Sequence, residues 1–186
     1  MRHVYVLGVM GSPRKGGNSD LLLSRALEGA AGQGARTEKV CLADMDLRPC
    51  LACEGCRAGG NCVQKDDMQE LYPRLQAAAG LVIATPVYWW GPSAQTKVFL
   101  DRWYALIPVR EAMEGKRVAV LCAHADDDPG TARHLLGMFE ESFRFLKMRL
   151  VGTLAVAADK RGGVAANRGA LARAEELGRL AACACA

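Results

Sequence analysis

The sequence lacks any long hydrophobic run, and this absence sets the first limit on what the protein does. The apolar segment Val4–Val9 is short and leads directly into Gly11-Ser12-Pro13. A membrane span needs about 20 apolar residues, and a secretory signal needs a longer apolar region followed by a small-residue cleavage site. We therefore expect a cytoplasmic protein with no membrane partner.

A strong excess of one charge is also missing. The net charge is only +4 over 186 residues, and the largest basic clusters are pairs such as Lys160-Arg161. Aromatic residues make up 6% of the chain, so a basic face interleaved with stacking aromatics, which nucleic-acid binding requires, is absent. We expect no nucleic-acid partner and interpret the charged residues as a solvated surface.

Histidine is scarce, whereas cysteine is not. The three histidines form no Ser-His-Asp or Cys-His pattern, which argues against hydrolysis. Eight cysteines are present. Disulfides are rare in the cytoplasm, so this number indicates metal or redox chemistry rather than a disulfide framework.

Short apolar runs alternate with segments of helical period along the whole chain. Strands are predicted at 4–9, 36–42, 81–84, 118–122 and 150–157, and helices at 19–31, 66–78, 93–105, 129–147 and 167–180. This alternation predicts an α/β fold in three layers, with a five-stranded parallel sheet of order 2-1-3-4-5. We expect a single domain, 1–186, with a cysteine-rich insertion at about 46–65.

A glycine-rich loop, residues 11–20, follows the first predicted strand. Its glycines let backbone amides approach an anion, and a helix that Asn18 or Ser19 can cap favours a phosphate at its start. Ser12 and Arg14 add side-chain donors. Gly17 stands where a Walker A loop needs Lys, and no Gly-x-Gly-x-x-Gly is present. An ordinary strand-to-helix turn is the alternative.

An aromatic loop, residues 85–93, follows the third predicted strand. It contains Tyr88, Trp89 and Trp90, and two prolines and a glycine restrict its shape. Exposed aromatic residues on a loop indicate a binding partner, and a flat heteroaromatic ring would stack on them. A hydrophobic plug or an oligomer interface would use the same residues.

These two loops resemble those of the NAD(P)H-dependent FMN reductase family of flavodoxin-like proteins. The resemblance is carried by Gly-Ser-Pro-Arg-x-x-Gly-Asn-Ser, Thr-Pro-Val-Tyr-Trp and the following Ser-Ala-Gln-x-Lys-x-Phe-x-Asp-Arg, and it is good over residues 4–105. It implies a flavodoxin-like fold, FMN as cofactor and NAD(P)H as substrate. It also implies phosphate binding by Ser12, Arg14, Asn18 and Ser19, and a flavin lined by Pro86, Val87, Tyr88, Trp89 and Gly91.

A run of four cysteines, Cys50, Cys53, Cys56 and Cys62, has the spacing Cys-x2-Cys-x2-Cys-x5-Cys. Three thiolates so spaced can cap three corners of a cubane, although the bacterial ferredoxin run has three residues before its last cysteine. The pattern resembles the iron–sulfur flavoproteins of the same family, which implies a 4Fe–4S cluster on these four residues beside the flavin. A zinc site and metal-free thiols or a redox disulfide stay open.

A third loop, 123–128, follows the fourth predicted strand. His124 is expected to hydrogen-bond a flavin carbonyl or to take part in proton transfer. The aspartates 126–128 are expected to cap the next helix.

The expected function is that of an FMN-dependent oxidoreductase, in which the cofactor performs the chemistry and no side chain acts as acid or base. Electrons would pass from NAD(P)H or a ferredoxin-type donor, through FMN and the cluster, to a small-molecule or ferredoxin-type acceptor. The alternatives are a cluster-free FMN or quinone reductase, a non-enzymatic electron carrier and a zinc-binding interaction module. We expect a homodimer or homotetramer with FMN near an interface.

Overall fold

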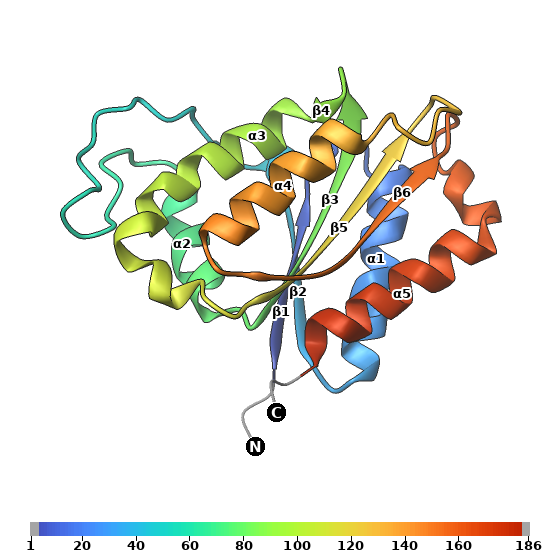
Figure 1. Cartoon of the computed structure of the whole chain (residues 1–186), viewed down its shortest axis with the longest axis horizontal. Helices are drawn as coiled ribbons and strands as arrows, with labels where there is room; N and C mark the ends of the chain where they lie inside the picture. Colours follow the sequence, from blue (N-terminus) through green and yellow to red (C-terminus); the bar gives the residue numbers. More distant parts are fainter. Residues whose placement is uncertain (1–3, 184–186) are drawn as a thin grey trace.

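Alternating strands and helices organise the chain around a parallel sheet (Figure 1). The structure is a computed structural model that describes residues 4–183. Its strands are β1 (Tyr5–Met10), β2 (Arg36–Cys41), β3 (Gly80–Tyr88), β4 (Gly91–Pro92), β5 (Arg117–His124) and β6 (Arg149–Ala157). Its α-helices are α1 (Asn18–Gly32), α2 (Met68–Ala77), α3 (Ala94–Asp101), α4 (Arg133–Phe145) and α5 (Arg168–Ala182). Three 3₁₀ segments complete it: η1 (Leu42–Asp44), η2 (Arg102–Ala112) and η3 (Gly163–Ala166).

The sheet has the order β2-β1-β3-β5-β6, and all of these neighbours are parallel. The expected α/β architecture with a parallel sheet is confirmed, but the expected five strands in order 2-1-3-4-5 become six. The added strand, β4, lies off this path because the aromatic loop turns back, so that Val87 pairs with Pro92 and Tyr88 with Gly91. The strand order reverses at β1: β2 lies on one side of it, and β3, β5 and β6 follow on the other. Ligands of such sheets bind at this switch point between β1 and β3.

Helices cover both faces of the sheet, as Figure 1 shows. On one face α1 and α5 pack against the sheet through an aliphatic cluster that includes Leu22, Leu23 and Leu177. On the other face α2, α3 and α4 contribute larger side chains, among them Phe99 and Phe143. The sheet is thus the middle of three packed layers, and the carboxyl ends of its parallel strands lie together at one edge.

Two predicted helices have different bounds in the structure. The helix expected at 93–105 ends as an α-helix at Asp101 and continues as η2, which contains Pro108 and a non-helical Val109. The helix expected at 129–147 begins at Arg133 with Ala132 as its N-cap. Aspartates 126–128 therefore do not cap α4. The Asp126 carboxylate instead accepts a hydrogen bond from the Asp128 amide (3.0 Å), and the Asp128 carboxylate accepts one from the Gly130 amide (2.8 Å).

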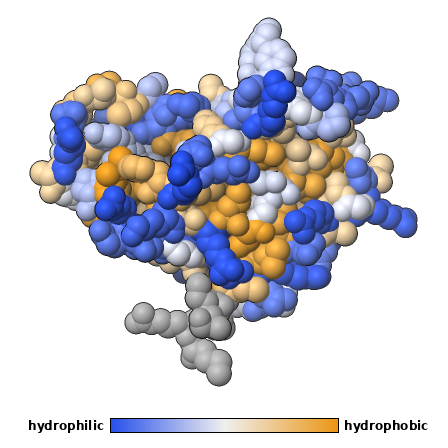
Figure 2. Space-filling view, in the orientation of Figure 1, coloured by the Kyte–Doolittle hydropathy of each residue, from blue (hydrophilic) through white to orange (hydrophobic). Residues whose placement is uncertain are grey.

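The edge strand β6 leaves apolar surface uncovered. Figure 2 shows hydrophobic residues gathered along this strand, and Leu150, Val151 and Leu154 are half-buried there. Among the helices within residues 4–183, none is both long and apolar enough to cross a membrane.

Helices α1 and α5 approach each other through two glycines. A Cβ atom on Gly178 would lie 1.7 Å from the Ala26 carbonyl oxygen, and one on Gly29 would lie 2.1 Å from that of Glu175. The obstacles are backbone atoms, which cannot rotate away as a side chain could. Contact between these two helices therefore requires the absence of side chains at both positions.

We predict that Gly178→Ala lowers the free energy of unfolding by about 1–3 kcal/mol, because the added methyl forces the two helices apart. Gly137→Ala is the matched control, since nothing lies within 4 Å of a Cβ on Gly137 of α4. There alanine should raise the free energy of unfolding by up to about 1 kcal/mol through its helix propensity. Urea unfolding followed by circular dichroism compares the two, and equal midpoints would contradict the packing argument.

Candidate functional site

Four loops at the carboxyl edge of the sheet surround a pocket of about 340 Å³, which falls within the range of small-molecule sites. The pocket includes eight of the ten residues predicted to contact FMN; Trp89 and Gly91 are not part of its lining. Its lining consists of Ser12, Arg14, Gly17, Asn18, Ser19, Pro86, Val87, Tyr88, Ala123, His124, Ala125, Ala158, Asp159 and Arg161. The fold thus brings the three loops singled out from the sequence to one place.

The glycine-rich loop after β1 forms the polar end of this pocket. Gly16 has a φ of +70°, and the Gly17 amide donates to the Arg14 carbonyl (2.9 Å), closing a tight turn. The Ser12 hydroxyl accepts from the Arg14 amide (3.2 Å), and Asp20 accepts from the Gly16 amide (2.7 Å). These internal hydrogen bonds fix the shape of the loop, and the Arg14 side chain is exposed at its edge, where it can turn toward an anion.

The side chain of Asn18 has a different role from the one expected. The N-cap of α1 is Gly17, and Asn18 is the first helical residue, so neither Asn18 nor Ser19 caps the helix. The Asn18 amide group donates to the carbonyls of Ala158 (2.8 Å) and Lys160 (3.0 Å) and accepts from the Val164 amide (3.1 Å). With both side-chain donors used, Asn18 fastens the glycine-rich loop to the loop after β6.

The fourth loop of the pocket, which follows β6, was not identified from the sequence. Asp159 and Arg161 lie after β6, and Arg161 donates to the Lys15 carbonyl (2.5 Å), across the rim of the glycine-rich loop. The signal was present in Lys160-Arg161-Gly162-Gly163, a basic and flexible segment directly after a predicted strand. A second guanidinium therefore accompanies Arg14 at the polar end of the pocket.

Buried hydroxyl groups fix the loops after β1 and β3 relative to one another. The Ser93 hydroxyl donates to the Gly11 carbonyl (2.5 Å) and contacts the Thr96 hydroxyl (2.9 Å), which donates to the Thr85 hydroxyl (3.1 Å). All three side chains are fully buried. Gly11 must lack a side chain here, because its Cβ would lie 1.9 Å from the Thr96 oxygen.

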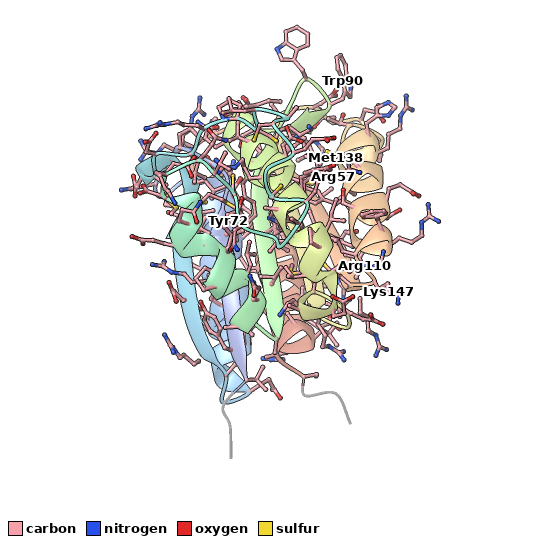
Figure 3. All side chains as sticks on the ribbon, turned by 90° about the vertical axis from the view of Figure 1, so that its left-hand side faces the viewer. Arg57, Tyr72, Trp90, Arg110, Met138 and Lys147 are labelled. Atoms are coloured by element: carbon pink, nitrogen blue, oxygen red, sulfur yellow. The ribbon has the colours of Figure 1, made fainter. Side chains whose placement is uncertain are left out.

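The tip of the β3–β4 hairpin presents two tryptophans outside the pocket. Trp89 and Trp90 have φ values of 50° and 59°, so both residues of this two-residue turn are left-handed, a conformation that usually selects Asn-Gly. The Trp89 side chain is 90% exposed, and Figure 3 shows Trp90 at the tip of the molecule. Such strain and exposure are typical of residues kept for a ligand or a partner.

His124 ends β5 at the wall of the pocket. It is buried, and its Nδ1 is 2.7 Å from the Asp126 carbonyl oxygen. This contact orients the ring and leaves Nε2 for other partners.

The four cysteines lie on a separate loop, residues 46–65, here called the cysteine loop. In Figure 1 it extends beside α2 and α3, away from the loops that follow β5 and β6. Within the described chain, none of the four cysteines lines the 340 Å³ pocket. The loop leaves η1 and passes beside η2, where Gly60 lies against Ala105 and Val109, before α2 begins.

The cysteine loop supplies the donors of a metal centre without arranging them as one. Cys56 is buried, which raises the pKa of its thiol, and the nearby thiols of Cys62, Cys50 and Cys53 raise it further. All the cysteines within residues 4–183 are free thiols. No three His, Cys, Asp or Glu side chains in that range converge as a metal-binding group. A hollow of about 350 Å³ opens between Cys50 and Tyr104, which leaves room for the loop to close.

A buried ion pair closes the base of the cysteine loop. The Arg102 guanidinium binds both carboxylate oxygens of Asp66, and both side chains are almost wholly buried. Burial alone would raise the pKa of Asp66, but hydrogen bonds from Arg102 and from the Arg48 and Met68 amides outweigh it and hold the pKa below its ordinary value. Both ends of the loop are thereby held to the start of η2.

Comparisons with known proteins identify the family and the fold. The family model for NADPH-dependent FMN reductase matches residues 4–168. An iron–sulfur flavoprotein of Methanocaldococcus jannaschii is 42% identical over 97 residues, which is 52% of this chain and 50% of that protein. The chain thus spans about half the length of this relative.

Solved structures share the architecture. The Trp repressor binding protein from Bacillus subtilis superposes with a TM-score of 0.72 at 26% identity, covering 93% of this chain and 99% of that one. A flavodoxin, WrbA-like protein from Agrobacterium tumefaciens gives a TM-score of 0.67 at 17% identity, covering 96% and 95%. The expected flavodoxin-like fold is confirmed, and the chain belongs to the NADPH-dependent FMN reductase family.

Proposed function

We propose that the protein is an FMN-dependent oxidoreductase that uses NAD(P)H as its electron donor. The observation that carries this proposal is the pocket at the switch point, whose polar end is built from a preformed glycine-rich turn with Arg14 and Arg161 nearby. Such a turn at the start of a helix favours a phosphate. The membership of the chain in the FMN reductase family supports the same assignment.

The residues of the pocket would divide the work of holding FMN. Backbone amides of the glycine-rich loop, the Ser12 and Ser19 hydroxyls and the two arginines would bind the phosphate. Pro86, Val87 and Tyr88 would lie along the flavin ring, with Gly91 paired to Tyr88 beside them, and His124 would offer Nε2 to a ring carbonyl. FMN, when bound, supplies hydride acceptance and one-electron exchange, while the protein positions it and excludes water.

We further propose that Cys50, Cys53, Cys56 and Cys62 hold a 4Fe–4S cluster once the cysteine loop closes. Four free thiols on one loop, electrostatically coupled around Cys56, are a suitable donor set for such a cluster. Similarity to an iron–sulfur flavoprotein supports this choice over zinc. The cluster would allow single electrons to leave toward a small-molecule or ferredoxin-type acceptor.

A second candidate function is that of a cluster-free NAD(P)H-dependent FMN or quinone reductase. One observation favours it: the described cysteines do not converge as a metal-binding group. In that case the thiols of the cysteine loop would take no part in the chemistry.

We also propose that the protein is cytoplasmic and forms a homodimer or homotetramer. The free thiols of the described cysteines suit a reducing compartment. Apolar surface along β6 and the exposed Trp89 and Phe145 suit contacts between copies.

The first prediction concerns the phosphate. Arg14→Met should raise the dissociation constant of FMN about tenfold or more, because a charge-assisted hydrogen bond contributes about 1.5–3 kcal/mol. Arg25→Met is the control, since Arg25 pairs with Glu28 on α1 outside this pocket. Fluorescence titration of the apoprotein with FMN measures both constants, and equal affinities in the two variants would refute the phosphate assignment.

The second prediction concerns the metal. Protein purified without oxygen should carry about four iron and four sulfide atoms per chain beside its flavin, and Cys53→Ala should abolish this iron. Cys41→Ala, a change in β2 outside the cysteine loop, should keep it. Iron, sulfide, zinc and flavin assays with a visible spectrum decide the matter. Flavin without iron in the wild-type protein would reject the cluster and favour the second candidate function.

A further inference from the structure

We propose that Arg102 is a positioning residue for the cysteine loop, which holds both ends of the loop and directs one N–H at the sulfur of Cys62. Cys62 would thereby be the preformed anchor on which the four-cysteine group is completed. This inference rests on the proposed function insofar as that group is the iron–sulfur cluster.

A single guanidinium reaches every part of the loop base. One terminal nitrogen, Nη1, donates to the Arg48 carbonyl (2.8 Å) at the start of the cysteine loop and to the Asp66 carboxylate just after its end. The other, Nη2, donates to Asp66 (3.0 Å) and lies 3.4 Å from the Cys62 sulfur. Arg102 is 1% exposed, so water does not compete for these contacts.

Asp66 completes the clamp from the other side. Its Oδ2 accepts from the Arg48 amide (3.0 Å) as well as from Arg102. Arg48, eighteen positions earlier, therefore has both its amide and its carbonyl engaged by the same ion pair. The Asp66 carboxylate neutralises the buried Arg102 guanidinium, which lowers the free-energy cost of burying its charge. The Nη2 atom of Arg102 remains directed at the Cys62 sulfur.

Tyr72 of α2 holds Arg102 from a second element. Its hydroxyl donates to the Arg102 carbonyl (3.0 Å), which holds the residue that carries the guanidinium. Figure 3 shows Tyr72 where α2 meets the cysteine loop. The Cys62 sulfur thus faces one charged donor, Arg102, whose backbone is held by Tyr72 of α2.

The other three cysteines are held differently. Cys50 and Cys53 are exposed, and the Cys50 sulfur accepts from the Ala52 amide of its own loop at 3.5 Å. Ala52 and Glu54, which flank Cys53, both have positive φ values, 52° and 57°. Cys56 is buried by apolar packing. Cys62 alone among the four is thus fixed by a charged donor, and the exposed Cys50 and Cys53 would move toward it when a cluster binds.

Two consequences follow for a bound cluster. A fixed ligand lowers the entropy lost when the remaining three close on the metal, which should improve retention. Hydrogen bonds to ligand sulfur and nearby positive charge also raise the reduction potential of iron–sulfur centres. Lysine cannot replace the planar fork that serves Arg48, Asp66 and Cys62 at once.

The test begins with metal-free protein. Arg102→Lys keeps the charge but loses the fork, and hydrogen exchange across residues 46–66 should become about tenfold faster, because a charge-assisted hydrogen bond is lost. Tyr72→Phe leaves the Arg102–Asp66 pair in place and should cause a smaller acceleration in the same segment. Arg74→Lys is the control: Arg74 pairs with Glu38 and Glu70 outside the loop, and exchange at 46–66 should not change.

The second measurement uses protein reconstituted with iron and sulfide. Arg102→Lys should lose iron faster to a chelator and lower the midpoint potential of the cluster, which a purely structural role would not shift. Tyr72→Phe, which releases the Arg102 carbonyl, should change both quantities in the same direction by a smaller amount. If Arg102→Lys fails to fold, the Tyr72→Phe variant decides. The inference would be overturned if both variants had the hydrogen-exchange rates, iron retention and midpoint potential of the wild-type protein. That outcome would leave the proposed cluster standing. A wild-type protein that binds no iron would instead reject the cluster, and with it the role of Arg102 toward a ligand.

Discussion

The Asp66–Arg102 ion pair is the interaction on which the cysteine loop depends. Both side chains are buried beneath a loop of about twenty residues that contains no helix or strand. Removing one partner of such a pair leaves a buried charge uncompensated, at a cost of about 3–5 kcal/mol. The pair also satisfies the Arg48 backbone. Hydrogen bonds between Asp46 and Asp67 also close the base of the loop, and the ion pair adds the contact to the Cys62 sulfur.

Much of the fold and the position of the pocket could be predicted from the sequence, because both follow from patterns that repeat along the chain. Buried parallel strands appear as short Val, Ile and Leu runs, and the loops after them must meet at one edge. The glycine-rich loop, the aromatic loop and the segment at His124 therefore share a pocket. The two-residue strand β4 was missed because it depends on a turn of two left-handed tryptophans, a conformation that the residues themselves disfavour.

What escaped prediction depends on contacts between residues far apart in the sequence. Asn18 was expected to cap α1 or bind phosphate, yet it bonds to carbonyls about 140 residues later. Arg161 was taken for solvated surface, because a basic pair in a sequence does not show that its backbone returns to the glycine-rich loop. The spacing of the cysteines was visible in the sequence. The position of their loop beside the sheet depends on the ion pair between Asp66 and Arg102, which are 36 residues apart.

Helix α3 connects the two sites and sets the spacing between them. It begins after Ser93, whose hydroxyl binds the Gly11 carbonyl next to the pocket, and Arg102 directly follows its last residue. At 1.5 Å per residue, these two anchors are separated by about 13 Å along the helix axis. Each end is fixed by buried polar contacts rather than by packing alone, so the helix cannot slide without breaking one set. The separation of the pocket from the base of the cysteine loop is therefore set by the fold.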